Sequence, residues 1–271
     1  MSEVVSPLEE LINLLDLEQI ETNLFRGYHP AGRKGRLFGG QIIAQALMAA
    51  TRTVPDDRPV HSVHAYFLRP GDPKVPALFD VERIRDGASF TTRRIVAIQH
   101  GKAIFNMDVS FQIVEAGLSH QMDMADFKPP QEDSIPDSLK QRPFISFRED
   151  HKILLEETPQ QPFQHIWIKS NGELPVDPVL HAALLSYQSD DALLGTARLP
   201  HRGSFERSRM QVASLDHSIW FHKPVKVDQW LLYSLDSPTA AHARGFTRGT
   251  VHTAEGELVA SCIQEGLIRL R

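Results

Sequence analysis

The amino-acid sequence predicts an α+β fold in which one structural unit, a helix followed by an antiparallel meander, occurs twice. Residues 39–50 and 178–188 both show apolar side chains at helical spacing. Each of these helices is followed by four strand-like segments that are separated by turn residues. Because the order of elements is the same in the two halves, we interpret the chain as a duplicated domain.

The N-terminal segment is expected to form a helix that begins at a capped residue. Ser6 fits the N-cap position, Pro7 fits the first helical position, and Glu9 completes a capping box. Residues 20–28 are then expected to be extended. A glycine-rich loop leads from there into the first of the two repeated helices.

The first unit is predicted from a helix without charges and from four hairpin-connected strands. The helix over residues 39–50 consists almost entirely of apolar or small residues, so we expect a curved sheet to bury it on every side. The turn sequences PGDP, RDG and QHG separate the strands. These strands are expected at residues 61–68, 77–84, 90–98 and 102–113.

The second unit repeats this order after an extended segment at residues 163–169. Asp177 is expected to cap the second helix, and Pro178 is expected to occupy its first position. Four strands follow again. They are expected at residues 214–222, 229–236, 243–253 and 257–268.

Two similar motifs mark matching positions of the two units. FLRPGD begins at Phe67, and FHKPVKVD begins at Phe221. We interpret both as scaffold, because a proline ends the hydrogen-bonded ladder of a strand and the aromatic ring packs on the helix. Gln112 follows the proline of the first motif, and Gln264 follows the proline of the second motif, at nearly the same distance along the chain. The repeat therefore extends over the whole unit.

A helix wrapped by a long antiparallel sheet, twice in one chain, is the double hot-dog arrangement. The predicted domains are an N-terminal hot-dog repeat at residues 1–114, a linker at residues 115–161 and a C-terminal hot-dog repeat at residues 162–271. The linker is rich in Pro, Asp, Glu, Gln and Ser, so we expect it to lie over the surface without a core of its own. Edge strands of the two sheets are expected to pair and to give one continuous sheet.

The composition excludes several classes of protein. With 271 residues, of which 41% are hydrophobic and 23% charged, the chain is long enough to bury a core. A formal net charge of −5, without a basic stripe, argues against nucleic-acid binding. No apolar run is long enough to cross a membrane, and the N-terminal segment carries acids where a secretory signal needs bases.

Cysteine usage and the last residues bear on the compartment. Cys262 is the only cysteine, so a disulfide framework and a cysteine-rich metal site are excluded, and a reducing compartment is expected. The final Arg-Leu-Arg lacks the Ser-Lys-Leu address of peroxisomal import. We therefore expect a cytoplasmic protein that uses neither a metal nor a cofactor.

The two units differ in where they carry acidic residues. No acid occurs over residues 35–53, which contain the first repeated helix and its approach. The second repeated helix ends with Ser189, Asp190 and Asp191. A carboxylate at this position has no counterpart in the first unit, so the fold itself does not require it.

Several longer motifs carry a family resemblance. They are GGQIIAQAL, HSVHAYFLRPGD, RDGASFTTRRIVAIQHGK, SLDHSIWFHKP and ASCIQEG. Together they resemble the acyl-CoA thioesterase II family, over nearly the whole chain outside the linker. The resemblance implies a double hot-dog enzyme of fatty-acid metabolism that hydrolyses acyl-CoA to free acid and CoA, and it implies a homodimer or homotetramer.

The same resemblance implies three catalytic residues that hold a water molecule. Asp190 matches the aspartate of a Tyr-x-Ser-Asp context, and Gln264 matches the amide of a Gln-Glu-Gly context. Ser214 stands two residues before an Asp-His pair, where the family has threonine. Serine keeps the hydroxyl but lacks the methyl that restricts the rotamer, so we expect a modest effect on rate.

Thioester hydrolysis needs a base, an oriented water and donors for the oxyanion. Asp190 would be the base, and Ser214 and Gln264 would orient the water. Gly39 and Gly40, at the start of the first repeated helix, are candidates for close approach to the oxyanion through a backbone N–H. Three basic residues are candidates for binding the phosphates of CoA, although exposed bases on strands are usually only solvated: Lys223, Arg244 and Arg248.

Residue type alone gives ordinary interpretations of the same positions. A pair of aspartates at a helix end is usually a solvated terminus, and a lone cysteine in an apolar strand is more often core filler than a nucleophile. Asp216 and His217 are adjacent, so a regular strand would point them to opposite faces and would leave Asp216 beside Ser214. His217 and His222 also differ in parity, which argues against a two-histidine metal site.

Two other functions remain open from the sequence. A hot-dog hydratase would be expected to carry a histidine five residues after the aspartate, but Gly195 and Thr196 stand at those positions. The chain could also be a binding module for acyl-CoA without catalytic activity. Release of free thiol from acyl-CoA separates these alternatives.

Overall fold

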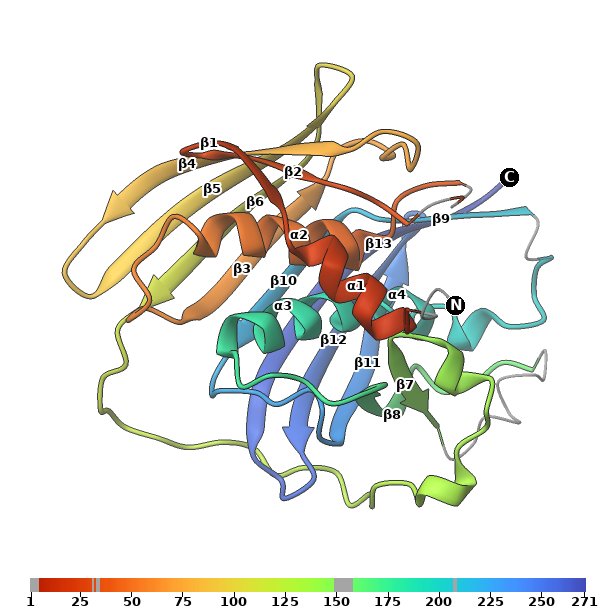
Figure 1. The fold of residues 1–271 in the computed structure, drawn as a ribbon. Helices are drawn as coiled ribbons and strands as arrows, with labels where there is room; N and C mark the ends of the chain where they lie inside the picture. The colour runs from red at the N-terminus through yellow and green to blue at the C-terminus, as the bar shows by residue number, and fades with distance from the viewer. Residues whose placement is uncertain (1–4, 31, 33–34, 149–157, 207–208) are drawn as a thin grey trace.

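The computed structural model describes residues 5–30, 32, 35–148, 158–206 and 209–271 (Figure 1). The first repeat contains α1 (Pro7–Leu15), β1 (Glu18–Glu21), β2 (Leu24–Gly27), α2 (Gly39–Thr51), β3 (Val60–Phe67), β4 (Ala77–Asp86), β5 (Phe90–Gln99) and β6 (Lys102–Gln112). These bounds confirm the predicted helix and the four strands that follow it. The segment predicted to be extended is a hairpin, because a turn at Thr22 and Asn23 divides it into β1 and β2.

The second repeat has the same order of elements, with additions. It contains β8 (Phe163–Ser170), α3 (Pro178–Ser189), α4 (Leu193–Thr196), β9 (Met210–Ser214), β10 (Asp216–Phe221), β11 (Leu231–Ala241), β12 (Arg244–Thr253) and β13 (Leu258–Leu270), with a short 3-10 helix at Leu199–His201. Two further 3-10 helices, at Glu132–Ser134 and Leu139–Gln141, and β7 (Phe144–Phe147) precede β8.

One antiparallel sheet runs through both repeats. Its order is β1-β2-β4-β5-β6-β3-β10-β13-β12-β11-β8-β7, and β9 pairs with β13 beside this path. The junction is the pairing of β3 with β10, in which Ala65 lies opposite His217. The expectation that edge strands of the two repeats pair is therefore confirmed, and each repeat protects an edge of the other.

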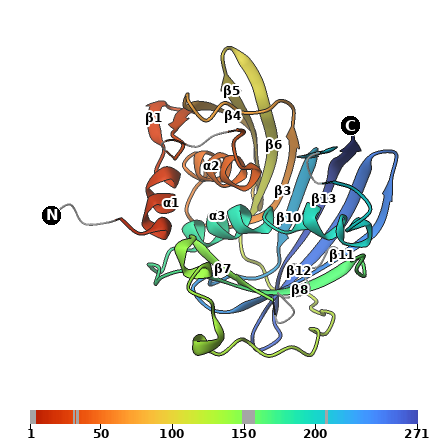
Figure 2. The ribbon, with the colours of Figure 1, turned by 90° about the vertical axis from the view of Figure 1, so that its right-hand side faces the viewer.

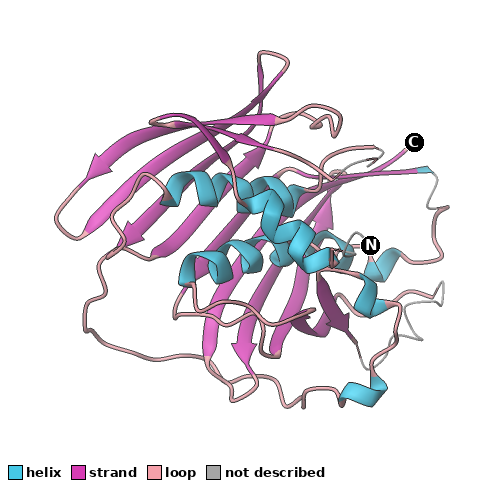
Figure 3. Cartoon of the chain, viewed as in Figure 1, coloured by secondary structure: helices cyan, strands magenta, loops and turns pink. Residues whose placement is uncertain are grey.

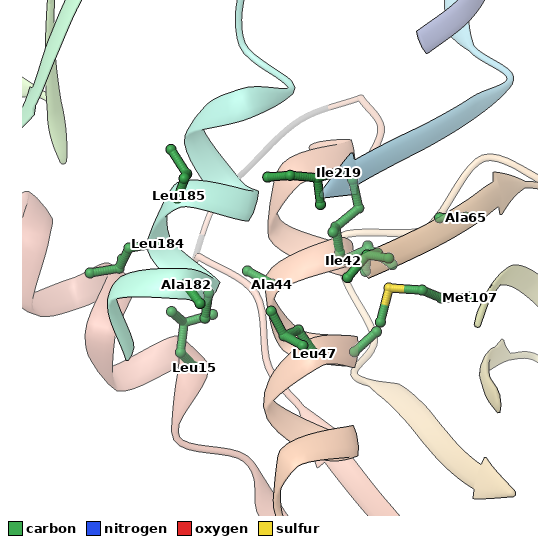
Figure 4. Close-up of a cluster of buried hydrophobic side chains, with 14 of the residues drawn as sticks. Leu15, Ile42, Ala44, Leu47, Ala65, Met107, Ala182, Leu184, Leu185 and Ile219 are labelled. Atoms are coloured by element: carbon green, nitrogen blue, oxygen red, sulfur yellow. The ribbon is translucent and has the colours of Figure 1, made fainter. Parts of the chain in front are cut away.

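The long helices α2 and α3 lie against the same face of the curved sheet, and α1 lies outside them (Figure 2, Figure 3). Residues 40–47 of α2 are all buried, which confirms the prediction that this helix is covered on every side. Apolar side chains from both repeats form one core between the helices and the sheet (Figure 4). They include Leu15, Ile42 and Leu47 of the first repeat and Leu184, Leu185 and Ile219 of the second.

The first turn of α2 approaches the backbone of α3 very closely. A Cβ atom on Gly40 would overlap the carbonyl oxygen of Tyr187, so only glycine fits at this position. The contact lies three residues before Asp190, at the end of α3 where the asymmetric carboxylate occurs. The crossing of the two helices therefore positions the Asp190 carboxylate.

The predicted helix caps are confirmed by their hydrogen bonds. Ser6 and Glu9 form both halves of the capping box of α1. The Asp177 carboxylate accepts the N–H groups of Val179 and Leu180 at the start of α3.

The expectation for the linker is wrong in part. Residues 149–157 lie outside the described residues, but Phe144–Phe147 forms β7 and pairs with β8 at the end of the sheet. Phe144, Ile145 and Phe147 are buried, as is Ile135. Apolar side chains within a mainly polar stretch thus attach its second half to the C-terminal repeat, so this half is not a simple surface linker.

A second correction concerns the strand predicted over residues 214–222. The chain divides at Leu215, where β9 ends and β10 begins. Leu215 donates its N–H to Glu265 O, and its carbonyl accepts the N–H of Phe67. The alternation of faces expected for a regular strand therefore does not hold across this point.

Candidate active site

The Asp190 side chain lies between the two repeats. Asp190 is the C-cap residue of α3, and its Oδ2 accepts the N–H of Gly40 at 2.9 Å. Phe38, the N-cap residue of α2, forms no side-chain cap hydrogen bond. A carboxylate from the second repeat thus caps a helix of the first, where the free N–H groups and the helix dipole favour an anion.

Gln264 and Ser214 meet the other carboxylate oxygen of Asp190. The Gln264 Nε2 lies 2.6 Å from Asp190 Oδ1 and 3.2 Å from Ser214 Oγ. Ser214 Oγ lies 3.5 Å from the same Oδ1. The structure therefore brings together the three side chains singled out in the sequence.

These residues differ in exposure. The Gln264 residue is 0% exposed, the Asp190 side chain is 5% exposed, and Ser214 is half-buried. Gln264 Oε1 is buried and has no hydrogen-bond partner among the described residues. A buried acceptor without a partner is rare and is expected at a place where water or a ligand binds.

Burial and hydrogen bonds act on Asp190 in opposite directions. Burial raises the pKa of the carboxyl group, because removal from water disfavours the charged form. The hydrogen bonds from Gln264, Gly40 and Ser214 lower the pKa, because they stabilise the anion. The pKa stays above the usual value for aspartate, which suits a general base better than an ordinary surface carboxylate.

Strand register explains how residues distant in sequence converge. Ser214, the last residue of β9, pairs with Gly266 of β13, two positions from Gln264. The Asp216 carboxylate accepts the Glu265 N–H at 2.6 Å. Asp216 therefore fixes the strand that carries Gln264, whereas the sequence suggested that it supports Ser214 directly.

His217 is a site residue that the sequence reasoning missed. Its side chain is fully buried, and its ring nitrogens lie 2.9 Å from Ser189 Oγ and 3.4 Å from Gln264 Nε2. Its Nδ1 lies 4.0 Å from Asp190 Oδ1. Burial lowers the pKa of His217 to about 4, so the ring is neutral near neutral pH. The Asp216–His217 pair was the available signal in the sequence. We assumed a regular strand, and in such a strand the His217 side chain would point to the face opposite Ser214.

The two glycines predicted to approach the oxyanion lie at the site in a different arrangement. The Gly40 N–H points to the Asp190 carboxylate, so in this structure it stabilises that carboxylate. Gly39 leaves room for the carboxylate, because a Cβ atom there would lie 2.6 Å from Asp190 Oδ2. The same Cβ atom would lie 2.9 Å from the ring of Phe67, so the aromatic residue of the FLRP motif forms part of the wall.

The three predicted phosphate-binding residues do not converge. Lys223 bonds to Glu257, Arg244 to Glu265 and Arg248 to Asp236, at 2.6 to 2.9 Å. The Lys223 N–H bonds to the carbonyl of Val259, whereas Arg244 pairs with Leu267 eight residues further along β13. This separation corresponds to roughly 27 Å of strand. Lys223 and Arg244 therefore cannot bind the same phosphate group.

Cys262 behaves as a core residue. It is 1% exposed, and burial raises the pKa of its thiol to about 12. A thiol with this pKa is protonated at neutral pH and is a poor nucleophile.

Among the described residues, no group of three or more His, Cys, Asp or Glu side chains is placed to hold a metal ion. No helix in the described part of the chain is long and apolar enough to span a membrane.

Comparison with protein families matches both halves of the chain. The family described as "Acyl-CoA thioesterase N-terminal domain" matches residues 28–112, and the family described as "Acyl-CoA thioesterase" matches residues 141–267. Acyl-coenzyme A thioesterase 8 of Mus musculus is 40% identical over 96% of this chain and 88% of its own length. Acyl-CoA thioesterase 2 of Haemophilus influenzae is 38% identical over 97% of this chain and 98% of its own length.

Solved structures give the same result. The acyl-CoA thioesterase II TesB2 of Mycobacterium marinum superimposes with a TM-score of 0.83 and 42% sequence identity, covering 97% of this chain and 98% of its own. A dehydratase domain of RzxB from Pseudomonas fluorescens has a TM-score of 0.55 at 12% identity, which shows a shared fold alone. The double hot-dog architecture, the two family matches and the full-length similarity to thioesterases lead to one conclusion: this chain belongs to the acyl-CoA thioesterase II family.

Proposed function

We propose that this enzyme hydrolyses the thioester bond of fatty acyl-CoA with a water molecule that Asp190 activates. The observation that supports this proposal most directly is the Asp190 carboxylate, which Gln264 and Ser214 contact on one oxygen and Gly40 contacts on the other. Each carboxylate oxygen can accept more than one hydrogen bond, so Asp190 keeps capacity for a water molecule. We place the access of solvent to the site at Ser214, which is half-buried.

In the proposed reaction, the water oxygen attacks the carbonyl carbon of the thioester while Asp190 takes the proton of the water. The negative charge that develops on the carbonyl oxygen needs N–H donors, and the N-terminus of α2 at Gly39 is the nearest candidate. The carbon–sulfur bond then breaks. The proton on Asp190 passes to the sulfur, so that CoA leaves as a neutral thiol and the acid remains.

Gln264 and Ser214 would place the water in this scheme. Ser214 Oγ can both donate and accept, so it can bind the water and Asp190 at the same time. The Gln264 Nε2 lies within hydrogen-bond distance of Asp190 Oδ1 and Ser214 Oγ, and its unpartnered Oε1 offers an acceptor for a proton of the water or of the substrate. Such preorganised contacts require little rearrangement during the reaction.

A direct test is the release of free thiol from acyl-CoA, followed with a thiol reagent over a panel of short, long, branched and aromatic acyl groups. A thioesterase is expected to release one thiol for each acyl-CoA consumed. A binding module without activity would bind acyl-CoA and release none. A hydratase would act only on unsaturated acyl-CoA and would also release none.

The position of His217 disfavours the hydratase in particular. Although its ring lies near Asp190, both ring nitrogens already have protein partners and the ring is fully buried. His217 therefore has no free nitrogen to offer to a substrate. A proton donor of this kind is what a hot-dog hydratase would need.

Ser214 provides a graded prediction. Ser214→Ala removes a hydroxyl next to a carboxylate, and it is expected to lower kcat on the order of 10–100-fold. Ser214→Thr keeps the hydroxyl and is expected to retain most of the activity, because only a methyl group is added at a half-buried position. Steady-state kinetics of both variants checks this order. Equal activity of Ser214→Ala and wild type would remove Ser214 from the proposed site.

We propose further that the enzyme is cytoplasmic and forms a homodimer or a homotetramer. The single free thiol of Cys262 supports a reducing compartment. Light scattering of the purified protein measures the mass of the assembly.

A further inference from the structure

His217 connects the candidate site to the interior of the second repeat through two hydrogen bonds. One ring nitrogen, Nε2, lies 2.9 Å from Ser189 Oγ. The other, Nδ1, lies 3.4 Å from Gln264 Nε2. His217 does not face solvent or an open cavity, so any effect that it has on the reaction must pass through these neighbours.

The partners of Ser189 determine which nitrogen of His217 carries the proton. The Ser189 hydroxyl donates to the carbonyl of Ser186 at 3.0 Å. Its oxygen is therefore left to accept, and it can take the Nε2–H of His217. A neutral imidazole has only one N–H, so Nδ1 has the free lone pair. It accepts one of the two N–H groups of Gln264, and the other N–H points to Asp190.

This lone pair favours one of the two orientations of the Gln264 carboxamide. In the orientation described above, Nε2 faces Asp190, Ser214 and His217. A rotation of the amide by half a turn would place its oxygen where Nε2 now lies, 2.6 Å from an Asp190 oxygen. Only a protonated Asp190 would tolerate that contact, and only the other tautomer of His217 would donate to the rotated amide.

We propose that His217 is a positioning residue whose Nε2-protonated tautomer, fixed by Ser189, holds the Gln264 amide with its N–H groups towards Asp190. This inference rests on the proposed function of Asp190 as the base. It assigns to Ser189 and His217 the task of keeping the carboxylate in the form that can accept a proton.

The other titratable groups around Asp190 and His217 lie on β11, on β13, at the end of α3 and on β10. On β11, the Tyr233 hydroxyl donates to the Ser189 carbonyl at 2.9 Å, and burial raises its pKa well above the usual value. The Cys262 thiol on β13 contacts Tyr233 and Ser189 and has a pKa of about 12. Asp191, which Arg148 faces, and Asp216 also have raised pKa values because of burial.

The matched pair of variants is Ser189→Ala and Ser186→Ala. Both remove a buried hydroxyl from α3, but among the described residues the Ser186 hydroxyl bonds only to the helix carbonyl of Ala182 at 2.8 Å. Ser189→Ala is expected to lower kcat about 2–10-fold with little change in KM. Ser186→Ala is expected to keep the kinetics of the wild type.

The pH profile gives a readout that a purely structural role would not produce. The pKa of Asp190 is raised by burial and lowered by the Gln264 hydrogen bond. Loss of that hydrogen bond raises the pKa further, so Ser189→Ala is expected to move the acid limb of kcat/KM to higher pH. Asp191→Asn, measured in parallel, identifies any part of that limb that belongs to Asp191.

Two further measurements test the role of His217 without the Ser189→Ala variant. Nitrogen NMR of the wild-type enzyme, with His217 assigned by its loss in His217→Phe, is expected to show a protonated Nε2 and an unprotonated Nδ1. His217→Asn, whose side-chain oxygen can take the place of Nδ1, is expected to retain more activity than His217→Phe, which fills the space without an acceptor.

The outcomes separate this inference from the proposed function. If Asp190→Asn is inactive while Ser189→Ala has the rates and the acid limb of Ser186→Ala, the positioning role is wrong and the proposed function stands. A protonated Nδ1 in the wild type also overturns the positioning role. If Asp190→Asn keeps its activity, the proposed function itself is wrong.

Discussion

Asp190→Asn is expected to reduce turnover of acyl-CoA by about 10²–10⁴-fold, the usual contribution of a general base. Asparagine is close to aspartate in size and keeps an oxygen for the Gly40 N–H, but it cannot take a proton from water. KM is expected to change little, because the carboxylate lies among protein donors and not at a separate binding surface. Kinetics with a thiol reagent over the panel of acyl chains gives both parameters.

The matched control for this prediction is Asp191→Asn. Asp191 is the next residue along the chain and is also a carboxylate, but Arg148 faces it in place of Gln264 and Ser214. It is expected to keep most of the turnover. Near-normal turnover of Asp190→Asn, or an equal loss in both variants, would exclude Asp190 as the specific base.

Gly40→Ala is expected to destabilise the fold by about 1–3 kcal/mol or more, the cost of overpacking a closely packed interior. The added Cβ atom would overlap the Tyr187 carbonyl, and this backbone oxygen cannot move without a shift of α3. The shift would also displace Asp190, so lower activity is expected together with lower stability. Urea unfolding measures the change in the free energy of unfolding.

A second helical glycine provides the control. Gly195 lies in α4, and a Cβ atom there would meet nothing within 4 Å. Gly195→Ala is expected to be neutral or to stabilise the protein by up to about 1 kcal/mol, because alanine loses less conformational freedom in a helix. If Gly40→Ala unfolded at the same urea concentration as Gly195→Ala, the close approach of α2 and α3 would not hold.

The repeated fold could be predicted from the sequence because its signals are local. Turn sequences such as PGDP and RDG divide the strands, and Asp177 followed by Pro178 starts α3 by chemistry that acts within one helical turn. The prediction of a surface linker was wrong at β7, because it relied on the average composition of the segment. Phe144 and Phe147 lie in a mainly polar stretch whose average composition concealed the two buried aromatic residues.

The candidate site could be predicted only through the family motifs. Asp190, Ser214 and Gln264 come from three elements, and no spacing along the chain implies their contact. The hydrogen bonds of His217 and Gly40 depend on a break at Leu215 and on the crossing of two helices. Such tertiary contacts leave no periodic signal, so reasoning from strand parity placed His217 away from the site.

Asp190 caps α2, and among the described residues the first repeat provides no equivalent contact for α3. The corresponding residue at the end of α2 is Arg52, which bonds to Asp16, and α3 already has its own cap in Asp177. The pseudo-symmetric position therefore lacks both the carboxylate and an uncapped helix to receive it. On the proposed function of Asp190, the fused pair of similar halves carries a single reaction centre, and an active-site titrant is expected to count one equivalent for each polypeptide.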